Sequence, residues 1–79
     1  MNITIKYFGV IAEQAGISIE SMRLEKEQAD LAEIKAVCFK KYNISDTDSI
    51  QTAINRELKE TGFLQTGDEL AFLPPFAGG

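Results

Sequence analysis

Apolar and polar positions alternate over residues 2–8. Three hydrophobic side chains fall on one face and three polar ones on the other: Ile3, Ile5 and Tyr7 against Asn2, Thr4 and Lys6. A period of two residues is typical of a half-buried strand. We therefore predict a first strand over residues 2–8.

The next pattern lies between Gly9 and Gly16, which enclose several apolar residues. This stretch is too short for a long helix and suits one or two helical turns. Alternation resumes at Ile17 and Ile19 and reaches Met22 after a phase slip of one residue, which indicates a β-bulge. A second strand, paired with the first like a hairpin, is the prediction.

A helical period dominates the middle of the chain. Five side chains recur at helical spacing: Leu31, Ile34, Val37, Cys38 and Tyr42. Asp30, with Glu33 three residues later, resembles a capping box. Lys40 and Lys41 place positive charge where the helix would end, and Asn43 can adopt the left-handed conformation that closes a helix. We predict the main helix here.

The second half of the chain predicts further strands. Within residues 50–58 the segment Ala53-Ile54-Asn55 ends in a turn-prone residue, and Thr66-Gly67-Asp68 signals a turn before residues 69–73. A loop region with room for a minor strand separates them. One sheet packed on one helix is the economical solution for this order of elements.

The predicted fold class is therefore α+β of the β-grasp kind. It has a mixed sheet of four to five strands packed on one main helix. The first and last strands are the most regular and apolar of their halves, so we expect them side by side in the middle of the sheet. The domain would span residues 1–73.

Composition and charge narrow the functional classes. Apolar residues make up 44% of the chain and charged residues 25%, a globular balance. The net charge is −4 and the basic residues are scattered, which argues against nucleic acid as a partner. No apolar run approaches the roughly 20 residues of a membrane span, and no secretory leader pattern opens the chain. We expect a cytoplasmic protein with no membrane partner.

The side chains offer little for catalysis. The chain has no histidine and a single cysteine, Cys38, which leaves too few ligands for a metal site and no usual general base. A glycine-rich phosphate loop is also missing, so we expect no bound metal or cofactor. Cys38 shares the helix stripe with Leu31 and Ile34, which favours core packing over a sulfur relay.

The chain ends in the uncharged run Pro74-Pro75-Phe76-Ala77-Gly78-Gly79. The prolines cannot continue a central strand and favour an extended arm, so residues 74–79 should leave the domain as a tail of at most about 20 Å. Because glycine has no Cβ, Gly78-Gly79 can thread a narrow channel. Gly-Gly alone would fit a frayed terminus, but the prolines, the apolar arm and the Gly-Gly together favour a function.

The reactive group of such a tail is the carboxylate of Gly79. A carboxylate is a poor electrophile, but adenylation by ATP makes a mixed anhydride that sulfur or nitrogen nucleophiles attack. Another enzyme supplies the site for this step. The chain itself then needs no catalytic side chain.

The run from Gly67 to Gly79, GDELAFLPPFAGG, resembles the C-terminal signature of molybdopterin synthase small subunits. Tyr7-Phe8-Gly9, with Glu13 and Gly16, is similar to the family's first strand and turn. Ala53-Ile54-Asn55 is similar to its third-strand motif, so the likeness spans nearly the whole chain. The resemblance implies a ubiquitin-like β-grasp sulfur carrier.

The resemblance also implies a reaction cycle in which the carrier is the sulfur-donating subunit and is not catalytic by itself. An adenylating, E1-like activating enzyme would use ATP and Mg to adenylate Gly79, and a sulfur donor protein would supply the sulfur of a thiocarboxylate. The tail would then enter the large subunit of molybdopterin synthase. Two transfers to a cyclic pyranopterin monophosphate build the dithiolene that holds molybdenum. The family works as a heterotetramer of two large and two small subunits.

Partner-binding residues follow from the same resemblance. Positions that match Phe8, Leu58 and Leu73 contribute to the contact with the large subunit. The contact would continue along the tail residues Pro74, Pro75, Phe76 and Ala77. The strand pattern agrees, because Phe8 and Leu73 have the opposite parity to the inward residues of their strands and would form an apolar patch beside the tail.

Three alternatives remain open from the sequence. A thiamine-pathway sulfur carrier has a similar fold and similar Gly-Gly chemistry, although Pro74-Pro75 argues for the molybdopterin role. A ubiquitin-like protein modifier would end up joined to lysines of other proteins. A β-grasp adaptor without covalent chemistry would leave the tail unexplained.

Overall fold

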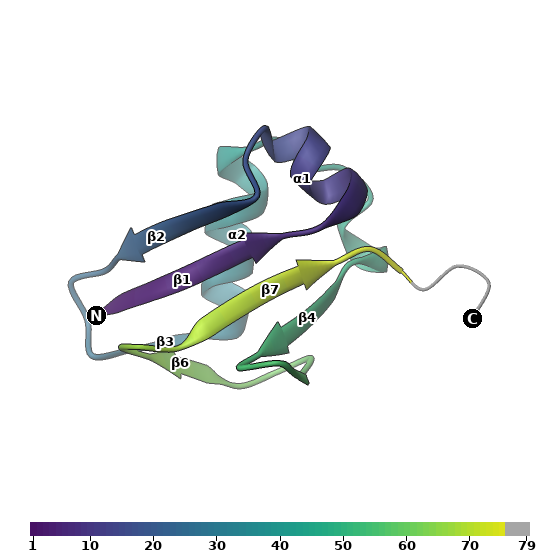
Figure 1. Ribbon diagram of the computed structural model, residues 1–79. Helices are drawn as coiled ribbons and strands as arrows, with labels where there is room; N and C mark the ends of the chain where they lie inside the picture. Colours follow the sequence, from purple (N-terminus) through teal and green to yellow (C-terminus); the bar gives the residue numbers. More distant parts are fainter. Residues whose placement is uncertain (76–79) are drawn as a thin grey trace.

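The chain folds into a five-stranded mixed sheet with a helix across one face (Figure 1). The computed structural model describes residues 1–75. The elements are, in chain order, β1 (Asn2–Tyr7), α1 (Gly9–Ala15), β2 (Ile19–Arg23), β3 (Gln28–Asp30), α2 (Leu31–Lys41), the 3₁₀ helix η1 (Thr47–Ser49), β4 (Gln51–Ile54), β5 (Glu57–Leu58), β6 (Phe63–Gln65) and β7 (Glu69–Leu73).

The strand order of the sheet is β2-β1-β7-β4-β5. β1 and β7 run parallel in its centre, and the other neighbours are antiparallel. The predicted α+β fold and the predicted contact between first and last strands are both confirmed. Because β1 and β7 are parallel, the C-terminal end of β7 lies beside the C-terminal end of β1, where α1 begins (Figure 1).

The hydrophobic core lies between the sheet and α2. Alternate residues of β1 and β7 meet the inner face of the helix, and the largest fully buried side chains are Tyr7, Phe72, Ile5, Leu31, Ile34, Leu64, Leu70 and Cys38. The ring centroid of Phe72 lies 5.0 Å from that of Phe39 and 5.5 Å from that of Tyr7. Each such side chain contributes about 1.5–3 kcal/mol of gross burial energy. This packing fixes which face of the sheet is left outside.

The main helix begins and ends close to the predicted positions. The Asp30 carboxylate accepts a hydrogen bond of 2.9 Å from the Ala32 N–H, so Asp30 caps the helix as predicted. Glu33 does not complete a capping box, because its carboxylate pairs with the ammonium of Lys26. Asn43 has a φ of 54°, the left-handed conformation expected beyond the helix end. Neither helix within residues 1–75 is long and apolar enough to cross a membrane.

The second strand differs from its prediction. Its pairing with β1 is continuous from Ile19 to Arg23, so the predicted bulge is wrong. Ile19 is 52% exposed, whereas Glu20 faces the core edge. Ile17 lies in the loop before β2 and is half-buried. The side chains that face the core therefore change from odd to even positions between this loop and the strand.

A second, two-stranded sheet of β3 and β6 closes one end of the core. Ala29 pairs with Leu64 across it, and both are buried. β6 occupies the region in which a minor strand had room, while β3 was not predicted. Gln28 and Gln65 flank the buried pair, so each strand carries only one inward apolar residue.

Candidate functional site

A row of side chains across the outer face of the sheet creates a groove. The strand register aligns Lys6 of β1 with Ala71 of β7, Ala71 with Ala53 of β4, and Ala53 with Leu58 of β5. Residues that are paired in register point to the same side of a sheet. Two small alanines therefore lie between two long side chains, and the face that points away from α2 is hollowed there. We call this hollow the outer-face groove.

The apolar walls of the outer-face groove come from residues far apart in the sequence. Phe8, Leu58 and Leu73 line it, and Pro74 and Pro75 line its end. Phe8 is 43% exposed and Leu58 is 64% exposed, so large apolar surface is presented to solvent around a concave floor. The structure thus brings together five of the residues that the sequence singled out. The other four, Phe76, Ala77, Gly78 and Gly79, lie outside the described residues.

The start of the tail is held against the beginning of α1. The Phe8 N–H donates a 3.2 Å hydrogen bond to the Phe72 carbonyl oxygen, which ties the ends of β1 and β7 together. Gly9 follows with a φ of +56°, and a Cβ built on it would lie 3.1 Å from Cγ of Pro74. Both the left-handed conformation and the close approach favour glycine. Gly9 therefore sets how the chain leaves the sheet after Leu73.

Replacing Gly9 with alanine is expected to shift the tail exit as well as reduce stability. The left-handed conformation costs an alanine about 1–2 kcal/mol, and the new Cβ also pushes on Pro74. Gly16→Ala is the matched control, because Gly16 has a φ of +74° with nothing within 4 Å of its Cβ position. NMR shifts of Leu73 and Pro74 should change in Gly9→Ala and stay unchanged in Gly16→Ala. Equal spectra for both variants would contradict this role of Gly9.

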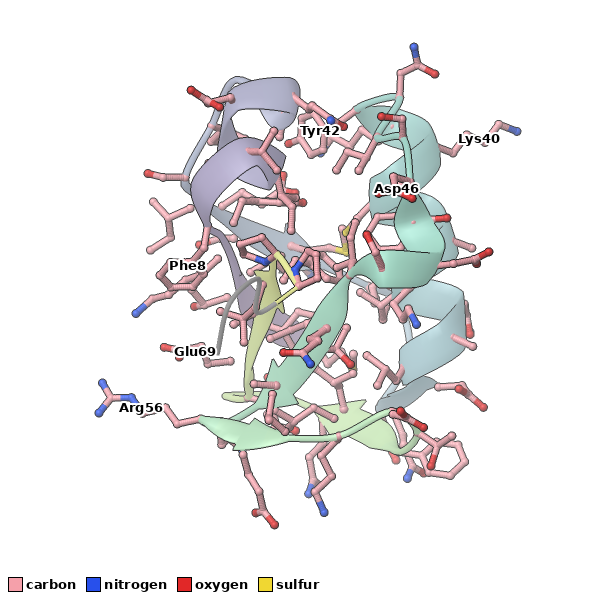
Figure 2. The ribbon with its side chains drawn as sticks, turned by 90° about the vertical axis from the view of Figure 1, so that its right-hand side faces the viewer. Phe8, Lys40, Tyr42, Asp46, Arg56 and Glu69 are labelled. Atoms are coloured by element: carbon pink, nitrogen blue, oxygen red, sulfur yellow. The ribbon has the colours of Figure 1, made fainter. Side chains whose placement is uncertain are left out.

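Charged groups rim the outer-face groove. Lys6 Nζ lies 3.1 Å from Glu69 Oε1, and this ion pair is partly exposed. Arg56 also lines the groove and extends from the turn between β4 and β5. Figure 2 shows Phe8, Glu69 and Arg56 projecting on one side of the molecule, opposite to Lys40 of α2. The groove therefore combines an apolar floor with a rim of two cations and one anion.

The sequence profile of the ThiS family matches residues 5–79. This chain belongs to the ThiS family. Its structure has the fold of the ubiquitin-like β-grasp sulfur carriers. No curated protein sequence shows significant similarity to it.

Solved structures of three proteins resemble this ThiS-family chain. The putative molybdopterin converting factor subunit 1 of Pyrococcus furiosus is 21% identical over 96% of this chain and 99% of its own, with a TM-score of 0.77. SAMP1 of Haloferax volcanii is 24% identical, with 100% of both chains covered and a TM-score of 0.75. A chain of the complex of subunits 1 and 2 of the Helicobacter pylori molybdopterin-converting factor is 22% identical, with 100% of both chains covered and a TM-score of 0.72. These likenesses confirm the ubiquitin-like β-grasp fold.

The one cysteine of this ThiS-family chain is part of its core. Cys38 is fully buried between α2 and the sheet, as the helical stripe predicted. Burial raises the pKa of its thiol, so the reactive thiolate is disfavoured. Within residues 1–75, no group of three or more carboxylate or thiol side chains is placed to hold a metal ion.

A polar cluster that the sequence did not reveal joins β2 to α2. Glu20 Oε1 accepts a 2.7 Å hydrogen bond from the Tyr7 hydroxyl, and Glu20 Oε2 accepts bonds of 2.7 Å from the Tyr42 hydroxyl and 2.9 Å from Lys41 Nζ. Burial by itself raises the pKa of Glu20, but these hydrogen bonds and the charge of Lys41 hold that pKa below its usual value. The carboxylate is thus stabilised as an anion. The cluster lies away from the outer-face groove and serves to fasten the edge strand.

Proposed function

We propose that this chain is the sulfur-donating small subunit of a molybdopterin synthase. The observation that carries the proposal is the grouping of Phe8, Leu58 and Leu73 around a groove that continues into Pro74 and Pro75. An exposed apolar concavity is typical of a protein-docking surface. Its continuity with the tail means that a partner seated in the groove also receives the tail. The likeness to molybdopterin converting factor subunit 1, once in complex with subunit 2, supports the same role.

The proposed site divides docking from chemistry. Apolar groups of the large subunit fill the outer-face groove above Ala53 and Ala71, and Leu58 and Leu73 lose their exposure to water. The four residues after Pro75 reach about 13 Å when fully extended, and this length limits how far Gly79 can extend from the groove into the partner's active site. We expect Phe76 and Ala77 to contact the partner along this path, and Gly78 to pass its narrowest part because glycine has no Cβ.

The proposed chemistry takes place at the Gly79 carboxyl group. In the activating enzyme, a carboxylate oxygen attacks the α-phosphorus of Mg-bound ATP and pyrophosphate leaves. Sulfur at the oxidation level of sulfide, delivered by a sulfur donor protein, attacks the acyl carbon, and AMP leaves with the bonding electrons. The product is a thiocarboxylate. Its sulfur attacks an electrophilic carbon of the pterin precursor, and an oxygen substituent of that carbon leaves with the bonding electrons. Water then attacks the acyl carbon and breaks the acyl–sulfur bond, which leaves sulfur on the pterin and restores the carboxylate.

Two alternatives share this activation chemistry and differ in the acceptor. The likeness to a thiamine biosynthesis protein (ThiS) of the same fold supports a thiamine-pathway sulfur carrier. The likeness to SAMP1, a small archaeal modifier protein, favours attachment to lysines of other proteins. The outer-face groove distinguishes the three roles only through the partner that it accepts.

An acceptor assay tests the proposal. The thiocarboxylated chain is incubated with the large subunit and pterin precursor in a first reaction, and with the thiazole-forming enzyme of thiamine synthesis and its substrates in a second. In a third reaction, the carboxylate form of the chain is incubated with the activating enzyme, ATP, Mg and a lysine-containing protein. We expect molybdopterin to form in the first reaction and neither thiazole nor conjugate to form in the others. Thiazole or conjugate without molybdopterin would replace the proposal with the corresponding alternative.

Replacing Cys38 with alanine is expected to leave sulfur uptake and donation intact. The buried thiol contributes packing, so its removal costs about 1–2 kcal/mol of stability, which is a fall of about 4–16 °C in Tm. Intact mass measures uptake, and thermal unfolding measures stability. Val37→Ala, on the same helix at a position that is 44% exposed, is the control with little effect on either. A folded Cys38→Ala protein that no longer transfers sulfur would make Cys38 a relay.

A further inference from the structure

Arg56 has a left-handed backbone conformation, at a turn position where glycine is preferred. Ile54 of β4 pairs with Glu57 of β5, so Asn55 and Arg56 alone form the hairpin loop. Their φ values are 51° and 71°, both positive. Two-residue loops with two positive φ values are type I′ turns, in which asparagine followed by glycine is the preferred pair. Asparagine is in its preferred place, and arginine stands where glycine would relieve strain.

The side chain of Arg56 is the reason to look for a compensating role. A left-handed residue with a Cβ is disfavoured, and such strain is typically kept where it serves a function. Arg56 is exposed and lines the outer-face groove. Burial in the core therefore does not offset the free-energy cost of its left-handed conformation.

The charges around Arg56 leave its guanidinium available. Lys6, the other cation of the groove, is paired with Glu69. Nζ of Lys59, which follows β5, lies 3.8 Å from Oε1 of Glu57. Among residues 1–75, no carboxylate lies within ion-pair distance of Arg56. Figure 2 shows its side chain reaching outward from the hairpin, beyond Glu69. The groove thus carries two cations and one anion, on a chain whose net charge is −4.

We propose that Arg56 is a specificity-determining residue that pairs with a carboxylate of the large subunit, placed beside the apolar groups that fill the outer-face groove. This inference rests on the proposed function. Guanidinium binds carboxylate through two parallel hydrogen bonds. The pair therefore sets the orientation of the docked partner and also requires a negative charge on the partner's surface. An acidic chain repels acidic surfaces in general. Arg56 is the cation of the groove that has no ion-pair partner among residues 1–75, so it selects the partner surface that carries an acid at this point.

The test measures binding and stability on the same variants. Arg56→Glu is expected to raise the Kd for the large subunit about 10–50-fold, and Arg56→Gln about 3–10-fold. Arg56→Gln should also make log Kd less dependent on salt concentration, because one ion pair is lost. Lys40→Glu makes the same charge change on the opposite side of the molecule and controls for net charge. Titration calorimetry at several salt concentrations gives these values.

Arg56→Gly separates a binding role from a structural one. Glycine relieves the strained turn, so Tm should rise by about 3–6 °C, while the Kd rises as in Arg56→Gln. A residue kept for stability alone would not show these opposite effects. The proposed function requires that the wild-type chain binds the large subunit and that Leu58→Asp weakens this binding. If both results are found but Arg56→Glu and Arg56→Gly bind like the wild type, only the Arg56 inference fails. If the wild-type chain does not bind the large subunit, both fail. A change in dimerisation of the free chain with unchanged Kd would assign the carboxylate to a second copy and overturn the proposal.

Discussion

A chain lengthened by one alanine after Gly79 is expected to take up no sulfur. The extension turns the Gly79 carboxylate into an amide, and it moves the new carboxylate one residue beyond the position at which an activating enzyme would hold it. An amide oxygen does not attack ATP under these conditions, so no acyl adenylate forms. Intact mass after incubation with ATP, Mg, the activating enzyme and a sulfur donor should show the oxygen-for-sulfur exchange in the wild-type chain only.

The fold should be unaffected by this change. β7 ends at Leu73, and among residues 1–75 the buried core contains none beyond Phe72. The circular dichroism spectrum and Tm of the extended chain should therefore match those of the wild type. Gly78→Val is a second variant, which keeps the terminal carboxylate and blocks a narrow channel with a β-branched side chain. Wild-type sulfur uptake by the extended chain would remove Gly79 from the mechanism.

Leu58→Asp is expected to raise the Kd for the large subunit by about 100-fold, close to 3 kcal/mol. Leu58 stands at the end of the row that begins with Lys6, and docking would bury its side chain against the partner. An aspartate there loses the apolar contact, and docking would exclude water from its unpaired charge. Phe8→Asp and Leu73→Asp should act in the same direction. Titration calorimetry measures the change, and adenylation by the activating enzyme should be less affected.

Phe63→Asp is the matched control for Leu58→Asp. Phe63 is 61% exposed, close to the 64% of Leu58, but it lies on β6 of the small second sheet. Both substitutions add one charge at an exposed apolar position outside the main core. The control should bind the large subunit like the wild type. Equal losses from the two variants would mean that the outer-face groove has no special part in docking.

Regular alternation made much of the fold predictable. β1 and β7 each carry a clear set of inward residues, and that parity also placed Phe8 and Leu73 on the outer side. The helix was predictable because Asp30 caps it and its apolar residues recur at the helical period. These signals are local, and each agrees with the tertiary packing.

The parts that were missed depend on contacts between distant segments. β2 faces the core with Glu20, a residue that hydropathy assigns to the surface. Its burial is tolerated because Tyr7, Tyr42 and Lys41 all donate hydrogen bonds to it. No local pattern contains that information. β3 was missed for a similar reason, since its one inward residue is stabilised by a strand more than thirty residues further along the chain.

The groove itself was only half predictable. The sequence pointed to its apolar walls, but its floor results from the register that aligns Ala71 with Ala53. A turn was predicted at Asn55, yet nothing in the pattern showed that Arg56 adopts a positive φ beside the groove. Backbone conformation and register therefore supplied the features on which the Arg56 proposal depends.

The most direct measurement follows one sulfur atom from the tail to the product. The chain is thiocarboxylated with isotopically heavy sulfur, purified, and mixed with the large subunit and with pterin precursor at half the concentration of the chain, because each dithiolene takes two sulfur atoms. Mass spectrometry then compares the chain with the molybdopterin formed. We predict that the label leaves the chain, restoring its carboxylate mass, and appears in the dithiolene of the product. Label that stays on the chain, or a product that contains only unlabelled sulfur, would contradict the claim that Gly79 is the sulfur donor.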